Sequence, residues 1–162
     1  MNQPIDSFDH AILSILQKNN ITPLRVIAEL VHLSTASVQR RIKRLEDSGV
    51  IQANSAIISP DKVGQAITII VEVHAAHVRA SDMKELKLCF SGPEIQQCYY
   101  VTGEADFMLV LTVASMAEYD AISGRLFYNN PNVKWFRTIV VMDRVKATLE
   151  TPLLLSNEAG TS

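Results

Sequence analysis

Apolar residues recur with a helical period in three short segments at the start of the chain. In the first segment they stand three or four positions apart, on one face of a helix: Phe8, Ala11, Ile12, Ile15 and Leu16. Residues 24–31 and 35–47 carry similar stripes. The pattern predicts three consecutive amphipathic helices with a shared hydrophobic core.

Side chains suited to helix capping stand before each stripe: Asp6, Thr22 and Ser34. Pro23 fits the first position of a helix, because its missing N–H is not needed there. Only His32-Leu33 separates the second predicted helix from the cap of the third. Two helices joined by so short a turn predict a helix-turn-helix domain, which we place at residues 1–51.

After a connector over residues 52–65, the hydrophobic pattern changes. Residues 67–74 alternate with a period of two, which predicts a strand. Helix and strand patterns then follow in the ranges 81–90, 95–101, 107–113, 115–128 and 133–145. The order β-α-β-β-α-β is that of a ferredoxin-like domain, predicted at residues 66–150 and followed by a fraying tail at 151–162. The predicted fold class is α+β.

The chain has 162 residues, with 15 Lys+Arg against 17 Asp+Glu and a net charge of −2. This balance excludes a protein that coats nucleic acid by bulk charge, although Arg40, Arg41, Lys43 and Arg44 form a local basic cluster. Two cysteines make no disulfide framework and the first ten residues are no secretory signal, so a cytoplasmic location is expected. The longest apolar stretch is too short for a membrane span, so no membrane partner is expected.

The predicted third helix divides its residues between two faces. With about 100° of rotation per residue, Val38, Ile42 and Leu45 share the inward face, while Arg40 and Arg44 lie on the other. Like charges one turn apart cost helix stability, which suggests an external anion. A basic run alone is more often a solvated surface, but the short turn and the caps favour double-stranded DNA. The expected DNA-binding residues are Ser34, Thr35, Ala36, Ser37, Gln39, Arg40, Arg41, Lys43 and Arg44.

The DNA-binding signature of the Lrp/AsnC (feast/famine) family of bacterial transcription regulators resembles the segment Leu33-Ser34-x-x-x-Val38-x-Arg40-Arg41-Ile42-x-Arg44-Leu45-Glu46-x-x-Gly49-Val50-Ile51. The family's opening helix is similar to Phe8-Asp9-x-x-Ile12-Leu13-x-x-Leu16-Gln17. The resemblance covers nearly the whole chain, because the family's ligand-responsive domain has the same βαββαβ order. His32 departs from the glycine that relatives often carry in the turn, although histidine tolerates a left-handed backbone better than most residues.

The loop between the second and third predicted strands is a candidate ligand site. Gly103 permits a backbone that exposes successive N–H groups to a carboxylate, and Asp106 is able to hold an ammonium. Without the resemblance, a turn glycine beside a solvated acid explains the loop better. The stretch Val101-Thr102-Gly103-x-x-Asp106 resembles the family's effector loop, which implies an amino-acid site. Whether Glu104 or Asp106 meets the amine is left open.

In the family, effectors lie in clefts between dimers, and the final strand contributes to them. The resemblance therefore implies these ligand-binding residues: Tyr100, Val101, Thr102, Gly103, Glu104, Asp106, Thr138, Ile139, Val140 and Val141. Tyr99 adds to an apolar wall, which favours leucine or methionine over a charged or amide side chain. The expected effector is thus a free apolar amino acid, and no cofactor is expected.

Two predicted segments, Phe107–Val113 and Ile139–Met142, are apolar on both faces. The helices of a ferredoxin-like unit cover only one side of its sheet, so we expect a homodimer packed sheet against sheet. The resemblance extends this expectation to a ring of four dimers, an octamer. No metal cluster and no catalytic group is expected. Two alternatives stay open: a ferredoxin-like small-molecule-binding module or metabolic enzyme without DNA binding, and an assembly protein without a ligand.

Overall fold

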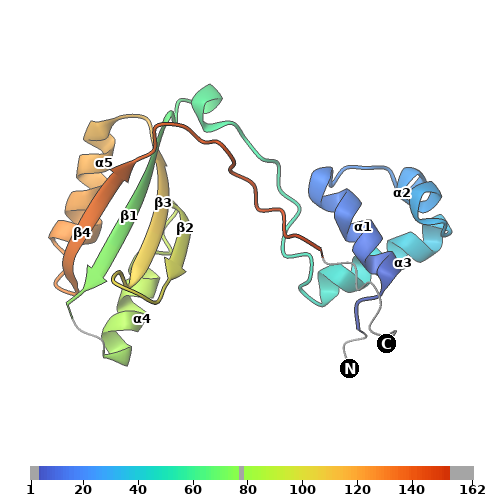
Figure 1. Cartoon of the computed structure of the whole chain (residues 1–162), viewed down its shortest axis with the longest axis horizontal. Helices are drawn as coiled ribbons and strands as arrows, with labels where there is room; N and C mark the ends of the chain where they lie inside the picture. Colours follow the sequence, from blue (N-terminus) through green and yellow to red (C-terminus); the bar gives the residue numbers. More distant parts are fainter. Residues whose placement is uncertain (1–3, 77–78, 154–162) are drawn as a thin grey trace, which may run out of the picture. The chain divides into compact units, whose positions relative to one another are not determined.

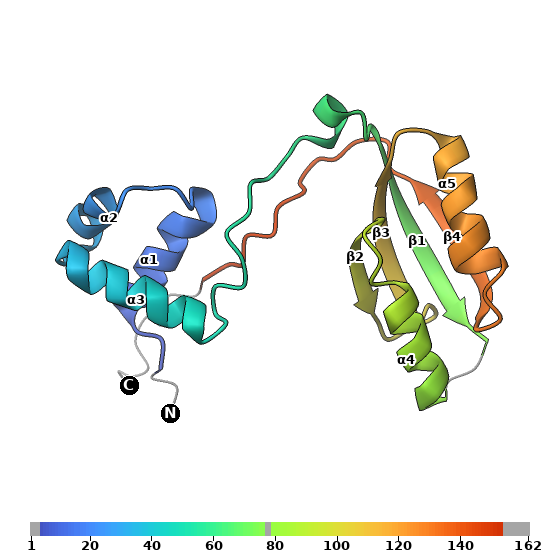
Figure 2. The same cartoon turned by 180° about the vertical axis from the view of Figure 1, so that it is seen from behind.

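The structure, a computed structural model, describes residues 4–76 and 79–153. It consists of two compact units, coloured along the chain in Figures 1 and 2. The first comprises the described residues up to Ala56 together with those from Lys146 onward, and the second is Ile57–Val145. Most of the predicted tail, residues 154–162, lies outside the described residues.

Three helices form the first unit: α1 (Ser7–Lys18), α2 (Leu24–Val31) and α3 (Thr35–Asp47). Two of the three predicted caps are confirmed. Asp6 accepts a hydrogen bond from the Asp9 amide and closes a capping box, and Ser34 accepts one from the Ser37 amide. The cap predicted at Thr22 is wrong, because Pro23 is the residue before α2 and the Thr22 hydroxyl donates to the Asn19 carbonyl.

The turn between α2 and α3 depends on His32, whose φ of 54° is left-handed. This conformation lets the amides of both His32 and Leu33 donate to the Ala28 carbonyl, which ends α2. The inward stripes then meet in one core, whose buried members are Ile12, Ile27, Ala28, Val31 and Val38. The core fixes the direction in which α3 presents its other face.

The described residues from Lys146 onward pack with the first unit. There the Gln17 side-chain amide makes two hydrogen bonds with the backbone of Thr151: the Thr151 N–H donates to Oε1 at 2.7 Å, and Nε2 donates to the Thr151 carbonyl at 3.2 Å. Fraying had been expected from residue 151 onward. Thr151 is instead held against α1.

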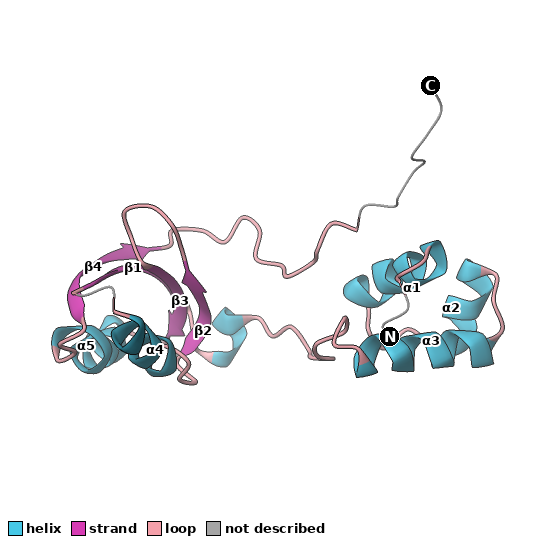
Figure 3. Cartoon of the chain, turned by 90° about the horizontal axis from the view of Figure 1, so that it is seen from below, coloured by secondary structure: helices cyan, strands magenta, loops and turns pink. Residues whose placement is uncertain are grey.

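The second unit has the predicted β-α-β-β-α-β order. Its elements are β1 (Ile67–Ala75), α4 (Ala80–Cys89), β2 (Ile95–Tyr100), β3 (Phe107–Val113), α5 (Met116–Ser123) with a π-helical turn (Gly124–Tyr128), and β4 (Val133–Val140). A short 3-10 turn, Pro60–Val63, precedes them. The antiparallel sheet has the strand order β2-β3-β1-β4, and Figure 3 shows α4 and α5 on one side of it. The α+β, ferredoxin-like fold class is confirmed.

The last strand is five residues shorter than predicted, because β4 ends at Val140 rather than Val145. Its neighbour β1 begins at Ile67, and Val140 already pairs with Ile69. One further backbone hydrogen bond joins the Val141 N–H to the Thr68 carbonyl, and there the pairing with β1 ends. An apolar pattern alone does not reveal where the partner strand ends.

The two faces of the sheet differ in burial. Ile69, Val71 and Val73 of β1 alternate with Ile70, Glu72 and His74, and the first set is fully buried against the helices. On β3 the buried set is Phe107, Leu109, Leu111 and Val113. The opposite face, which we call the open face, carries half-buried Ile70, Met108 and Val110. It is therefore partly apolar without being covered in one protomer.

Candidate DNA-binding helix and ligand loop

The outward face of α3 begins at its capped N-terminus. Six of the nine predicted DNA-binding residues are exposed: Ser34, Thr35, Ala36, Gln39, Arg40 and Lys43. The Arg40 Nη2 donates to the Ser37 hydroxyl at 3.3 Å, and the Lys43 Nζ lies 3.1 Å from the Asp47 carboxylate one turn further on. Small polar residues thus precede two cations along one exposed helix face.

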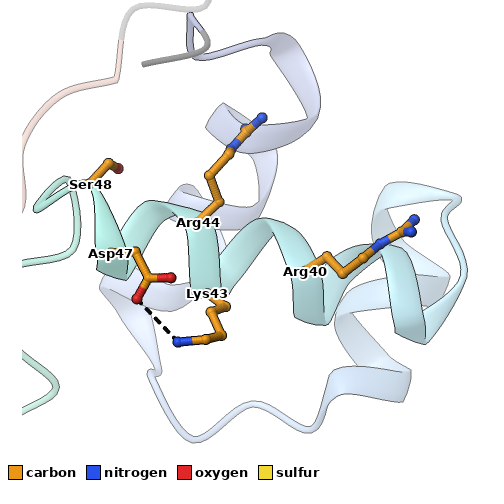
Figure 4. A pocket seen from close by; sticks show the side chains of 5 residues that line it. All are labelled: Arg40, Lys43, Arg44, Asp47 and Ser48. Carbon is orange, nitrogen blue, oxygen red and sulfur yellow. Dashed lines mark hydrogen bonds and ion pairs between the residues drawn. The ribbon is translucent and has the colours of Figure 1, made fainter. Parts of the chain in front are cut away.

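A shallow hollow lies beside these cations and is lined by Arg40, Lys43, Arg44, Asp47 and Ser48. Figure 4 shows that Arg40, Lys43 and Arg44 point in different directions from α3. Arg44 was expected beside Arg40 on the outward face. Its guanidinium instead pairs with Asp9 of α1.

Asp9 is a functional candidate that the sequence analysis missed. Its carboxylate is fully buried, and it accepts from Arg41 Nη1 at 2.8 Å and from Arg44 Nη2. Arg41 Nη1 also donates to Asp6 at 2.8 Å. Its place in the sequence could have revealed this role. Asp9 stands three residues before Ile12 and seven before Leu16, so it lies on the buried face of α1.

The carboxylate of Asp6 is affected by the same cluster. Burial raises its pKa, but hydrogen bonds from the Asp9 amide and the Arg41 guanidinium together outweigh burial and hold the pKa of Asp6 below its ordinary value. The same acids raise the pKa of Arg41, with the hydrogen bond to Asp9 as the largest cause. Both groups are therefore charged at neutral pH.

The candidate ligand loop turns at Gly103, whose φ of 123° belongs to the region that favours glycine. The two acids of the loop differ. The Asp106 carboxylate accepts the Ala75 N–H at 2.8 Å, and the Asp106 N–H donates to the Val73 carbonyl at 3.0 Å, so Asp106 holds the end of β1. Glu104 is exposed.

The predicted ligand residues that lie in strands are divided between the two faces of the sheet. Thr138 pairs across from buried Val71, and its hydroxyl bonds to that of Tyr119 on α5. The Tyr100 ring lies 5.2 Å from Phe107, also on the helix side. Ile139, one residue after Thr138, points to the open face, as does Tyr99 beside Tyr100. These residues of one protomer do not surround a single ligand.

Features of other function classes are weak in the part of the chain that the structure describes. It holds no group of three or more side chains placed to bind a metal ion. Burial raises the pKa of both thiols, Cys89 and Cys98, which disfavours the reactive thiolate. None of the described helices is long and apolar enough to cross a membrane.

Comparison with known proteins agrees with the two units. Residues 68–151 match the family model of the Lrp/AsnC ligand binding domain, and residues 5–52 match a winged helix-turn-helix DNA-binding model. The HTH-type transcriptional regulator y4tD of Sinorhizobium fredii is 43% identical over 150 residues, which cover 92% of this chain and 89% of that protein. The leucine-responsive regulatory protein of Haemophilus influenzae is 34% identical over 148 residues, covering 91% and 89%.

A solved structure extends the likeness to the whole fold. The transcriptional regulator NMB0573 of Neisseria meningitidis, crystallised as an L-Met complex, superposes with a TM-score of 0.86 at 25% identity and covers 93% of this chain and 98% of that one. All three similar proteins are transcription regulators rather than enzymes.

A helix-turn-helix unit followed by a βαββαβ ligand-binding domain defines a class of DNA-binding transcription regulators. Within that class, this chain belongs to the Lrp/AsnC family. The family resemblance stated from the sequence is confirmed.

Proposed function

We propose that this regulator binds double-stranded DNA through the outward face of α3 and that a free amino acid bound to the second unit changes its DNA affinity. The observation that carries the DNA part is the exposed face that starts at the capped N-terminus of α3. Ala36 is short enough to let the helix approach base edges, and the Gln39 amide is suited to an adenine edge. Arg40 and Lys43 are suited to phosphates or guanine. Arg41 and Arg44, held by Asp9, are assigned to support this face.

The proposed effector is an apolar amino acid, leucine or methionine. Its carboxylate would bind to backbone N–H groups around Gly103, and Glu104 is the better candidate for its ammonium because Asp106 is bonded to Ala75. The names of two similar proteins, one leucine-responsive and one complexed with L-Met, support this choice. Burying a leucine-sized side chain is worth about 1.5–3 kcal/mol, whereas a buried ammonium or amide without a partner costs about 1–3 kcal/mol.

The site is proposed to lie between protomers. Its candidate residues fall on both faces of one sheet, so a second chain is needed to enclose the ligand. The partly apolar open face supports a dimer packed sheet against sheet, and the family resemblance supports an octamer. The effector would then act by linkage. It would favour one assembly of the protomers, which changes the spacing of the paired α3 helices and therefore the affinity for DNA.

DNA binding is tested with a labelled duplex from the region upstream of the protein's own gene, measured by fluorescence anisotropy. Arg40→Ala should weaken binding and make the salt slope of log K less steep by about 0.9, the value for one phosphate contact. Arg25→Ala on α2 is the matched control, since Arg25 is exposed and, among the described residues, pairs along its own helix with Glu29. Equal affinity of Arg40→Ala and wild type would contradict the assignment of this face.

The effector is tested by calorimetry against all twenty amino acids. Leucine or methionine should bind best, and Gly103→Val should abolish binding because valine does not adopt a φ of 123°. Gly64→Val is the control for strain, since Gly64 has a φ of 82° outside the loop. A preference for a charged or amide side chain would contradict the pocket. If the protein binds a ligand but not DNA, the small-molecule-binding module is favoured. If it binds neither a ligand nor DNA, the assembly protein is favoured.

A further inference from the structure

A half-buried serine near the start of α3 is hydrogen-bonded to two other side chains of the same helix end. The Ser37 hydroxyl accepts from the Ser34 hydroxyl at 3.1 Å and from Arg40 Nη2 at 3.3 Å. Serine is less favourable than alanine within a helix, because its hydroxyl competes for backbone hydrogen bonds. The contacts of Ser37 are therefore better explained by their effect on Arg40 than by the stability of the helix.

Arg40 differs from the other cations of the basic cluster in the charge of its partner. The other three cations each pair with a carboxylate. Within the described residues Arg40 forms no ion pair, and the Ser37 hydroxyl that it contacts is neutral. The hydrogen bond therefore orients the guanidinium without neutralising the charge that attracts a phosphate.

The same contact sets the direction of the Arg40 side chain. Ser37 precedes Arg40 by three positions, so the two side chains are neighbours on the helix surface and the bond holds the guanidinium toward the N-terminal end of α3. Figure 4 shows Arg40 extending away from Ser48, which lies at the opposite end of the helix. In helix-turn-helix proteins the N-terminal residues of the recognition helix are those that approach the bases.

We propose that Ser37 is a positioning residue that holds Arg40 in its DNA-binding orientation before DNA is bound. The proposal rests on the DNA-binding role of the outward face of α3. Its physical basis is conformational entropy, because an exposed arginine loses rotamer freedom when it binds, and a side chain that is already held loses less. Since Ser37 acts through Arg40, its effect on DNA affinity should vanish when Arg40 is absent.

The test measures the affinity of the full chain for the labelled duplex from upstream of its own gene, by fluorescence anisotropy over a range of KCl concentrations. Ser37→Ala should weaken binding by about two- to tenfold, the cost of ordering one long side chain. The slope of log K against log salt should stay unchanged, because Arg40 keeps its charge and its phosphate contact. Equal affinity of Ser37→Ala and wild type would overturn the proposal.

A double-mutant cycle distinguishes positioning from a direct contact of Ser37 with DNA. In the Arg40→Ala background, Ser37→Ala should change the affinity by less than about twofold, because the side chain that Ser37 positions is gone. If Ser37→Ala weakens binding there as much as it does in the wild-type background, Ser37 contacts DNA itself and the proposal is wrong.

Urea unfolding distinguishes positioning from folding. The cap of α3 uses the backbone N–H of Ser37, which donates to the Ser34 hydroxyl at 3.2 Å and is retained in Ser37→Ala. The urea midpoint of Ser37→Ala should therefore not fall while its DNA affinity does, and a fall in both would overturn the proposal.

Two further variants complete the test. Ser37→Thr keeps a hydroxyl and should bind DNA like wild type, whereas a loss equal to that of Ser37→Ala would contradict the role of the hydroxyl. Ser48→Ala is the matched control, because the Ser48 hydroxyl donates to the Leu45 carbonyl at the other end of α3, and its affinity should stay unchanged.

Failure of the DNA-binding role itself gives a different result. In that case Arg40→Ala binds the duplex as tightly as wild type does. If Arg40→Ala weakens binding and Ser37→Ala does not, only the positioning role of Ser37 is wrong.

Discussion

His32 holds a backbone conformation that few side chains tolerate, at the point where α2 must end and α3 begin. A left-handed φ costs an L-residue about 1–2 kcal/mol, less for histidine than for a β-branched side chain. We predict that His32→Gly raises the free energy of unfolding by about 0.5–1 kcal/mol and that His32→Val lowers it. Urea unfolding of the full chain checks both, and a loss of stability in His32→Gly would contradict the strain.

Asp6 should make the first unit sensitive to acid. Its pKa is lowered in the folded state, so its contribution to stability is complete above the ordinary aspartate pKa of about 3.9 and is lost as the pH falls through the lower folded value. Asp6→Asn keeps a capping side chain. Its urea midpoint should lie below that of wild type at neutral pH and should fall less on acidification. Parallel acid curves for the two proteins would contradict this.

The residues predicted correctly from the sequence act locally. Asp6, Ser34 and His32 cap or turn the chain within a few positions, so the order of residues was sufficient. Asp9 and Arg44 are 35 positions apart and meet only when α1 packs on α3. A helical wheel drawn for α3 alone therefore placed Arg44 on the outward face.

Between elements, the Asp106 carboxylate has a structural role that competes with the expected contact to an effector. We predict that Asp106→Ala lowers the free energy of unfolding of the ligand-free protein by about 1–2 kcal/mol, because the Ala75 N–H at the end of β1 loses its partner. Glu104→Ala on the same loop should change stability by less than about 0.5 kcal/mol. Thermal unfolding distinguishes them, and equal stability of the two variants would contradict the role of Asp106.

At the scale of elements, the sequence predicted that each strand exists but did not predict where β4 ends. The continuous apolar run at residues 107–113 located β3 at its observed bounds, whereas β4 stopped when its neighbour β1 ended. The same limit affects the candidate ligand residues. A run such as Thr138–Val141 was grouped by sequence, but strand geometry sends Thr138 toward α5 and Ile139 to the open face.

At the scale of the whole molecule, the partly apolar open face is the surface from which we predict a homodimer. We expect Val110→Lys to convert a dimer into monomers, because the lysine would lie in the centre of the sheet-to-sheet contact. Leu88→Lys is the control, since Leu88 is 66% exposed on α4, on the covered side of the sheet. Light scattering gives the mass of each. A monomeric wild-type protein, or dissociation in both variants, would contradict the interface.

The two hydrogen bonds between Gln17 and Thr151 also bear on how such regulators are recombined. The DNA-binding unit is discontinuous in sequence, since residues from both ends of the chain form it and the ligand-binding unit is inserted between them. A chimera of two such regulators with a single junction after Ala56 would receive the C-terminal segment of its first unit, the part from residue 146 onward, from the other parent protein. Two junctions, before Ile57 and after Val145, would exchange the ligand-binding unit while each first unit kept its own C-terminal segment.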